Sequence, residues 1–127
     1  MARFLWICLG GAAGTGARYL LSGWLLRLAG PVFPWGTLAV NLLGSFLLGF
    51  LMQTAATTEI LRPTLRLALT TGVMGGFTTY STFNYEMLRL LQEGAWTLAA
   101  ANLAATVLGC LLAGLLGMAG ARWLLGG

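Results

Sequence analysis

Long apolar runs, separated by short segments that contain polar residues, glycine or proline, make up nearly the whole chain. The runs cover about residues 4–28, 35–55, 64–91 and 95–125. A helix needs about 20 mainly apolar residues to cross the roughly 30 Å hydrocarbon core of a bilayer. The pattern therefore predicts an all-α membrane protein with four transmembrane helices, forming a single transmembrane domain over residues 1–127.

The first run begins like a signal peptide, because Arg3 precedes an apolar stretch and small residues follow near residues 14–17. The apolar character continues to Leu28, however, and this is too long for the apolar region of a signal peptide. We therefore expect the segment to remain in the protein as its first membrane helix.

Charged residues are few and restricted in type. Hydrophobic residues make up 58% of the chain and charged residues 8%, and the net charge is +4. All seven basic residues are arginine, all three acidic residues are glutamate, and histidine is absent. Histidine is the commonest general base and metal ligand, and without Asp or Lys most hydrolytic and phosphoryl-transfer chemistry lacks its side chains. We expect a protein that is not an enzyme, and the scattered positive charge does not favour nucleic-acid binding.

The arginines give only a weak signal for orientation. With four spans, one side carries Arg3, Arg62, Arg66 and Arg122, and the other carries Arg27 and Arg89, with Arg18 in or at the end of the first helix. Arginine and lysine prefer the cytoplasmic side, but the difference in arginine number between the two sides of this chain is small. Two interpretations stay open: the chain inserts in both directions, or it has one fixed orientation that the charges signal poorly.

Polar residues within the second run share one helix face. Thr37, Asn41 and Ser45 are spaced by four residues. The Asn amide offers a donor that can face an anion and an acceptor for another group. The alternative is a hydrogen bond that joins two helices, worth about 0.6 kcal/mol on average, and the segment alone favours this alternative.

The third run is interrupted near residues 75–79, where two glycines precede a cluster of hydroxyl and aromatic residues. Irregular backbone at membrane depth occurs where it is buried in protein or lines a cavity. Freed carbonyls of a broken helix can hold a cation, and half-helix N-termini favour anions. A plain glycine kink is the alternative. Tyr80 and Phe83 share a face, and the positive edge of an aromatic ring can meet an anion, although packing alone would also explain them.

Asn102, Thr106 and Cys110 form a third polar stripe, again with a spacing of four. Together with Asn41 and Ser81 they could form a ladder of donors across the bilayer. Arg18 could draw anions into a vestibule, or it could extend its side chain to the membrane interface. Small residues at near-four spacing, such as Gly10 and Gly14, allow helices to approach closely. A chain of four helices has little interior, so we expect its polar groups to need a partner subunit.

Three segments together resemble the Fluc/CrcB family of fluoride channels: residues 10–19 with Arg18-Tyr19, residues 34–44 with Gly-Thr-Leu-Ala-Val-Asn, and residues 72–83 with Gly-Gly-Phe-Thr-Thr-Tyr-Ser-Thr-Phe. The resemblance covers all four predicted spans in order. It implies a fluoride-selective channel that lets cytoplasmic fluoride leave the cell passively, in the inner membrane of a prokaryote. It also implies an antiparallel, dual-topology homodimer with two pores.

The resemblance further assigns roles to single residues. It implies a structural sodium ion at the dimer centre, held by the main-chain carbonyls of Gly75 and Thr78, and a vestibule arginine at Arg18. The pore residues that it implies are Asn41, the aromatic pair Tyr80 and Phe83, and a hydroxyl track of Ser81, Thr82 and Thr106, with Asn102 and Cys110 at neighbouring positions and Thr37 on the face of Asn41.

Two residues depart from the family pattern. The family often has Phe at the position of Tyr80, and a hydroxyl is common at the position of Cys110, whose thiol is a weaker donor. Two other functions remain as alternatives. A small multidrug transporter needs a carboxylate in its first membrane helix, which this chain lacks. A scaffold subunit would explain the glycines but not the polar ladder.

Overall fold

The computed structural model describes residues 1–126, and every regular element in this range is helical. This confirms the predicted all-α class. Helix α1 spans Ala2–Ala29, α2 spans Trp35–Thr57 and α6 spans Trp96–Leu125. The third apolar run is divided into α3 (Pro63–Leu67), the π-helix η1 (Ala68–Met74), α4 (Gly75–Phe77) and α5 (Tyr80–Gln92).

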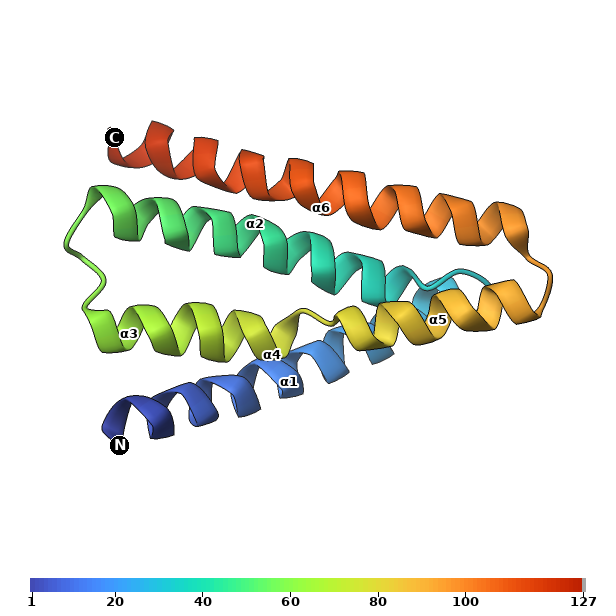
Figure 1. Ribbon diagram of the computed structural model, residues 1–127, viewed down its shortest axis with the longest axis horizontal. Helices are drawn as coiled ribbons and strands as arrows, with labels where there is room; N and C mark the ends of the chain where they lie inside the picture. The colour runs from blue at the N-terminus through green and yellow to red at the C-terminus, as the bar shows by residue number, and fades with distance from the viewer. Residues whose placement is uncertain (127) are drawn as a thin grey trace.

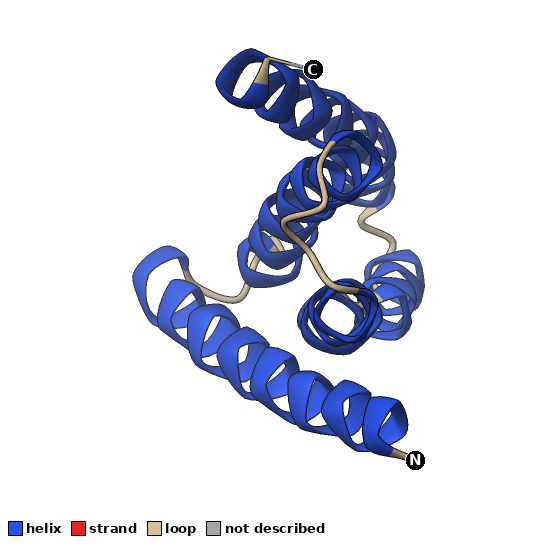
Figure 2. Ribbon diagram, turned by 90° about the vertical axis from the view of Figure 1, so that its left-hand side faces the viewer, coloured by secondary structure: helices blue, strands red, loops and turns tan. Residues whose placement is uncertain are grey.

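The chain passes back and forth along a flat bundle (Figure 1). Both termini and the α2–α3 connection lie at one end, and the α1–α2 and α5–α6 connections lie toward the other. Figure 2 shows α1 and α6 on opposite sides of the molecule. Helix α2 packs against α6, and α1 packs against η1 and α4. Helix α1 also contacts α2, and the third run lies beside both helices.

The outer surface is apolar, as the composition predicts for a membrane protein. Helices α2 and α6 are long and apolar enough to cross a membrane. The lateral face of α6 exposes large aliphatic side chains, among them Leu108, Leu111, Leu112 and Leu115. A soluble protein rarely exposes a continuous apolar face of this kind. The exposed leucines therefore fit contact with lipid or with another chain.

Glycines allow α1 to lie directly against the third run. A Cβ atom on Gly14 would overlap the carbonyl oxygen of Val73, and one on Gly76 would overlap the carbonyl oxygen of Gly11. Helices approach this closely only where side chains are absent. The small-residue stripe of the first run thus brings the α1 backbone next to η1 and α4.

The third run changes course at Thr78 and Thr79, which form the extended segment between α4 and α5 (Figure 1). Thr78 has φ −81° and ψ 154°, and Thr79 has φ −148° and ψ 110°. Before α4, residues Ala68–Met74 are wound as a π-helix, a rare form that is frequent at functional sites. The backbone groups on both sides of Thr78 and Thr79 lose their helical hydrogen-bond partners and need others.

Candidate functional site

A cavity of about 260 Å³, here called the central cavity, lies beside the extended segment. Its walls come from α2, α5, α6 and the segment itself, and its lining residues are Asn41, Ser45, Thr78, Thr79, Tyr80, Phe83, Thr106, Val107 and Cys110. Five of these residues, from three separate apolar runs, were predicted for an anion path. The fold thus brings Asn41, Tyr80, Phe83, Thr106 and Cys110 to one place.

Asn41 holds the backbone of the extended segment. Its Nδ2 donates to the Thr79 carbonyl oxygen over 3.1 Å, and its Oδ1 accepts from the Thr79 N–H over 2.7 Å. The side chain is buried. An amide nitrogen has two N–H groups, and Thr79 uses one of them. The second is therefore available to a ligand in the central cavity.

Thr79 caps the start of α5. Its Oγ1 accepts from the Thr82 N–H over 3.2 Å and lies 3.0 Å from Thr82 Oγ1 and 3.4 Å from Ser81 Oγ. The first turn of α5 contributes Tyr80 and Phe83 to the central cavity. A helix N-terminus carries partial positive charge. The cavity wall therefore favours an anion although no lining residue is formally charged.

The aromatic pair has two different environments. The ring centroids of Tyr80 and Phe83 are 5.8 Å apart and the ring planes are inclined by 59°. Phe83 is 6% exposed, whereas Tyr80 is 77% exposed. Within one chain, Phe83 is the inner wall of the central cavity and Tyr80 is its open rim.

Comparison with other proteins identifies the family. Residues 5–118 match the family described as CrcB-like protein, Camphor Resistance (CrcB). A fluoride-specific ion channel FluC from Sorangium cellulosum (strain So ce56) is 61% identical over 127 residues, which is 100% of both chains. The chain belongs to the CrcB family. Proteins with the same name from Anaeromyxobacter dehalogenans and Geobacter sulfurreducens are 58% and 48% identical, over 99% and 98% of this chain and 100% of their own. The resemblance inferred from the sequence motifs is thus confirmed.

In this CrcB protein, Thr37 lies in a neighbouring cavity. This second cavity, of about 280 Å³, also contains Glu86 and Arg89 and is closed by the α1–α2 connection. Thr37 Oγ1 donates to Glu86 Oε1, and Arg89 Nε lies 4.0 Å from Glu93 Oε1. Thr37 therefore shares the helix face of Asn41, as its spacing predicted, but its hydroxyl proton is used by a carboxylate.

Asn102 is 1% exposed and joins two helices. Its Nδ2 donates to Met87 Sδ over 3.4 Å, and its Oδ1 accepts from Thr106 Oγ1 over 3.3 Å. It lies outside the lining of the central cavity, as do Ser81, which is exposed, and Thr82, which is half-buried. The structure thus brings only part of the predicted hydroxyl track to the cavity wall.

Arg18 reaches the C-terminal end of α4. Its Nε donates to the Gly76 carbonyl oxygen over 3.1 Å, and Thr15 Oγ1 donates to the same oxygen over 3.5 Å. In a continuous helix this carbonyl would accept from the N–H of Tyr80. Because the chain is extended at Thr78 and Thr79, α1 supplies the replacement donors. A cation at a helix C-terminus is favourable as well.

The carbonyls of Gly75 and Thr78 can take part in cation binding. A continuous helix would pair them with the N–H groups of Thr79 and Thr82. Those N–H groups donate elsewhere, to Asn41 Oδ1 and to Thr79 Oγ1. Both oxygens are thereby released from helical pairing, and oxygen atoms are the ligands that hard cations prefer. The donor chemistry fits a sodium ion.

Thr79 has a role that was not predicted. It connects Asn41 to α5, because it bonds Asn41 with its backbone and Thr82 with its side chain. Threonine is a preferred residue immediately before a helix, where its oxygen accepts from an N–H two or three positions on. The Thr79-x-x-Thr82 spacing directly after the Gly-Gly interruption carries this signal.

Proposed function

We propose that this CrcB protein is a fluoride-specific ion channel, not an enzyme, and that fluoride passes through the central cavity. The relatives that it matches over their full length are named fluoride-specific ion channel FluC. The observation that carries the proposal is the joint presence of Asn41, Phe83 and Thr106 around one cavity at the N-terminus of α5. The alternative of a small multidrug transporter is not favoured.

Dehydration of fluoride is the main barrier to such a path. Removing a small anion from water without replacement contacts costs far more than ordinary binding energies. The second N–H of Asn41, the ring edge of Phe83 and the positive end of α5 supply replacement interactions. Several modest donors in sequence let the ion enter and also let it leave. The transport that results is passive.

The working unit that we propose is an antiparallel, dual-topology homodimer. The third run exposes Thr71, Gly75, Ser81 and Asn84 together with Tyr80. Polar groups and irregular backbone that face lipid at membrane depth are costly. An inverted second copy would cover this face, close the open rim of the central cavity, and place the extended segment in mid-membrane.

The sodium ion fits the same arrangement. The carbonyls of Gly75 and Thr78 from two inverted copies would provide four backbone oxygens around one point. When bound, the ion would neutralise the negative ends of these dipoles and fix the two extended segments to each other. We place the dimer in the inner membrane of a prokaryote, where it would lower cytoplasmic fluoride and confer fluoride resistance; the relatives are bacterial.

Replacement of Phe83 tests this proposal. Phe83→Ile keeps an apolar side chain of similar depth but removes the ring edge, so we expect fluoride efflux from liposomes to fall at least about tenfold while the protein elutes normally on size exclusion. Tyr80→Phe is the matched control, because it keeps the ring, and it should retain most of the flux. Wild-type efflux in Phe83→Ile would remove Phe83 from the pore.

A further inference from the structure

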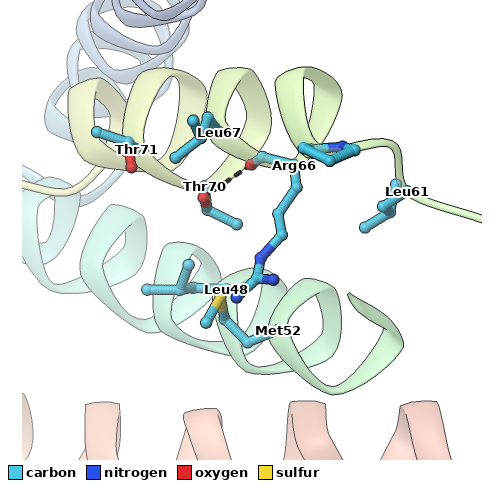
Figure 3. Close-up of a pocket in the computed structure, with 8 residues that line it drawn as sticks. Leu48, Met52, Leu61, Arg66, Leu67, Thr70 and Thr71 are labelled. Atoms are coloured by element: carbon cyan, nitrogen blue, oxygen red, sulfur yellow. Dashed lines mark hydrogen bonds between the residues drawn. The ribbon is translucent and has the colours of Figure 1, made fainter. Parts of the chain in front are cut away.

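A cavity of about 540 Å³ lies between α2 and the α3–η1 segment, at the end of the bundle that holds both termini (Figure 3). Its walls are mostly apolar, with Leu48 and Met52 from α2 facing Leu67. Arg66 is the charged residue among its lining residues. This combination of low-dielectric walls and one positive charge differs from the rest of the apolar surface.

The Arg66 side chain extends from α3 across this cavity toward α2 (Figure 3). Arginine stays protonated at all ordinary pH values. Among residues 1–126, the structure gives Arg66 no carboxylate partner; the ion pair that it contains joins Arg89 and Glu93. Because it has no carboxylate partner in this range, the guanidinium is available to an anion that enters the cavity. Thr70 Oγ1, in the same cavity, donates to the Arg66 carbonyl oxygen over 2.7 Å.

The Arg66 cavity and the central cavity are neighbours along α2, with a third cavity adjoining both. A cavity of about 330 Å³ lies between them; it shares Ser45 and Cys110 with the central cavity and Leu48 and Met52 with the Arg66 cavity. These α2 residues recur every three or four positions and so follow one helix face. From Thr37 to Met52 the face is about 22 Å long at 1.5 Å per residue. The cavities thus lie in a line along this helix face.

The two ends of this line differ in charge. The cavity at the other end contains the Glu86 carboxylate as well as Arg89, so its charges largely offset each other. The Arg66 cavity has no acidic lining residue. A cleft lined by one sign of charge raises the local concentration of the opposite ion.

We propose that the Arg66 cavity is an anion-collecting entrance, at which Arg66 raises the local fluoride concentration at one end of the path through the central cavity. The proposal rests on the proposed function, because it takes the central cavity as the fluoride path. It assigns the capture of fluoride to Arg66, whereas Arg18 is occupied with the Gly76 carbonyl.

Fluoride efflux from liposomes of uncharged phosphatidylcholine tests this entrance, measured for wild type, Arg66→Gln and Arg66→Lys at subsaturating fluoride. Electrostatic capture is strong at about 10 mM ionic strength, where the screening length is roughly 30 Å, and weak at about 1 M, where it is roughly 3 Å. We expect Arg66→Gln to lower the flux about threefold at low ionic strength and by less than about 1.5-fold at high ionic strength. Arg66→Lys should stay near wild type.

Arg62→Gln is the matched control. Arg62 lies four residues earlier at the same end of the molecule, but it lines a separate cavity with Trp6 and Leu65. The Arg62→Gln variant should leave the fluoride flux unchanged at both ionic strengths. An equal effect of Arg62→Gln, or an Arg66→Gln effect that does not depend on salt, would overturn the proposal. An effect seen only in vesicles with anionic lipid would also overturn it, because it would assign Arg66 to a lipid phosphate.

A second variant tests the cavity separately from the α3 side chain. Met52→Lys adds a positive charge from the α2 wall of the same cavity, and in the Arg66→Gln background it should restore most of the lost flux at low ionic strength. Absence of this rescue in a protein that elutes as wild type would contradict the entrance. A wild-type protein that passes no fluoride would instead contradict the proposed function, so the two failures are distinguishable.

Discussion

Asn41 determines the backbone path at the centre of the site. Its amide takes the Thr79 N–H that a continuous helix would have given to the Gly75 carbonyl, and it returns a donor to the Thr79 carbonyl. A buried backbone group left without a partner costs about 1–3 kcal/mol. One side chain of α2 therefore stabilises an extended conformation in a neighbouring run that would otherwise be unfavourable.

Loss of this side chain should affect both stability and transport. We expect Asn41→Ala to lower the free energy of unfolding by about 1–3 kcal/mol, because two buried backbone groups of Thr79 lose their partners. Ser45→Ala, on the same face and in the same cavity, should change it by less than about 0.5 kcal/mol. Thermal unfolding in detergent measures the difference, and equal melting temperatures for the two variants would contradict this role of Asn41.

A charge at the same position tests transport. Asn41→Asp keeps the acceptor for the Thr79 N–H but replaces the donor by a negative charge beside the anion path. Fluoride efflux should be abolished in a protein that still elutes as the wild type does. Normal efflux in this variant would show that the anion does not pass Asn41.

At the scale of residues, spacing and the family motif together predicted which side chains share the central cavity. The four-residue periods placed Asn41 with Thr37, and Thr106 with Cys110, on shared helix faces, and the family motif added Phe83. The hydrogen-bond partners of these side chains could not be predicted, because they depend on the relative positions of different apolar runs. Thr37 bonds Glu86, and Asn102 bonds Met87, and no local pattern in the sequence specifies either contact.

At the scale of elements, α1 stabilises the divided third run. Its glycines allow close approach, and Arg18 and Thr15 then reach the Gly76 carbonyl that the extended segment leaves without a helical donor. A neighbouring helix thus supplies the hydrogen-bond donors for a carbonyl at the C-terminal end of α4. Helix α1 therefore belongs to the structural support of the central cavity although it contributes no lining residue.

Replacement of Arg18 tests this support. Arg18→Met keeps an aliphatic side chain but removes the donor and the charge, and it should lower the free energy of unfolding by about 1–3 kcal/mol. Arg3→Met, in the exposed first turn of the same helix, should cost less than about 0.5 kcal/mol. Thermal unfolding of both variants makes the comparison. The same melting temperature in both would mean that the Gly76 contact adds nothing to stability.

The apolar runs predicted where the helices lie because burial in lipid requires about 20 apolar residues, and this requirement is visible in any single segment. The two glycines followed by hydroxyl residues pointed to an interruption near residues 75–79, and the structure has its extended residues at Thr78 and Thr79. The π-helix η1 was not predicted. It packs against α1, and the sequence of Ala68–Met74 carries no sign of the wider winding.

At the scale of the whole molecule, the third run exposes an aromatic ring and several polar residues. Tyr80 and the polar residues of the third run lie on the surface of the single chain. The all-α class and the CrcB family follow from the sequence, because apolar runs and motifs are properties of one chain. The orientation in the membrane does not, because nearly balanced arginines are compatible with one or with two orientations.

Labelling of loops tests the inverted assembly. Glu59→Cys and Glu93→Cys lie at opposite ends of the bundle and can each be made in a Cys8→Ala, Cys110→Ser background. An impermeant maleimide applied outside sealed vesicles should label about half of the molecules of each variant if both orientations occur. Complete labelling of one variant and none of the other would show a single orientation.

Selective transport of fluoride tests the central claim most directly. The purified protein in liposomes loaded with potassium fluoride or potassium chloride, with valinomycin to balance charge, should release fluoride rapidly and retain chloride. In the proposed path the Asn41 amide and the Phe83 ring edge replace the water around a small anion, and we expect the larger chloride ion to be excluded. Release of both anions at the same rate, or of neither, would contradict the account.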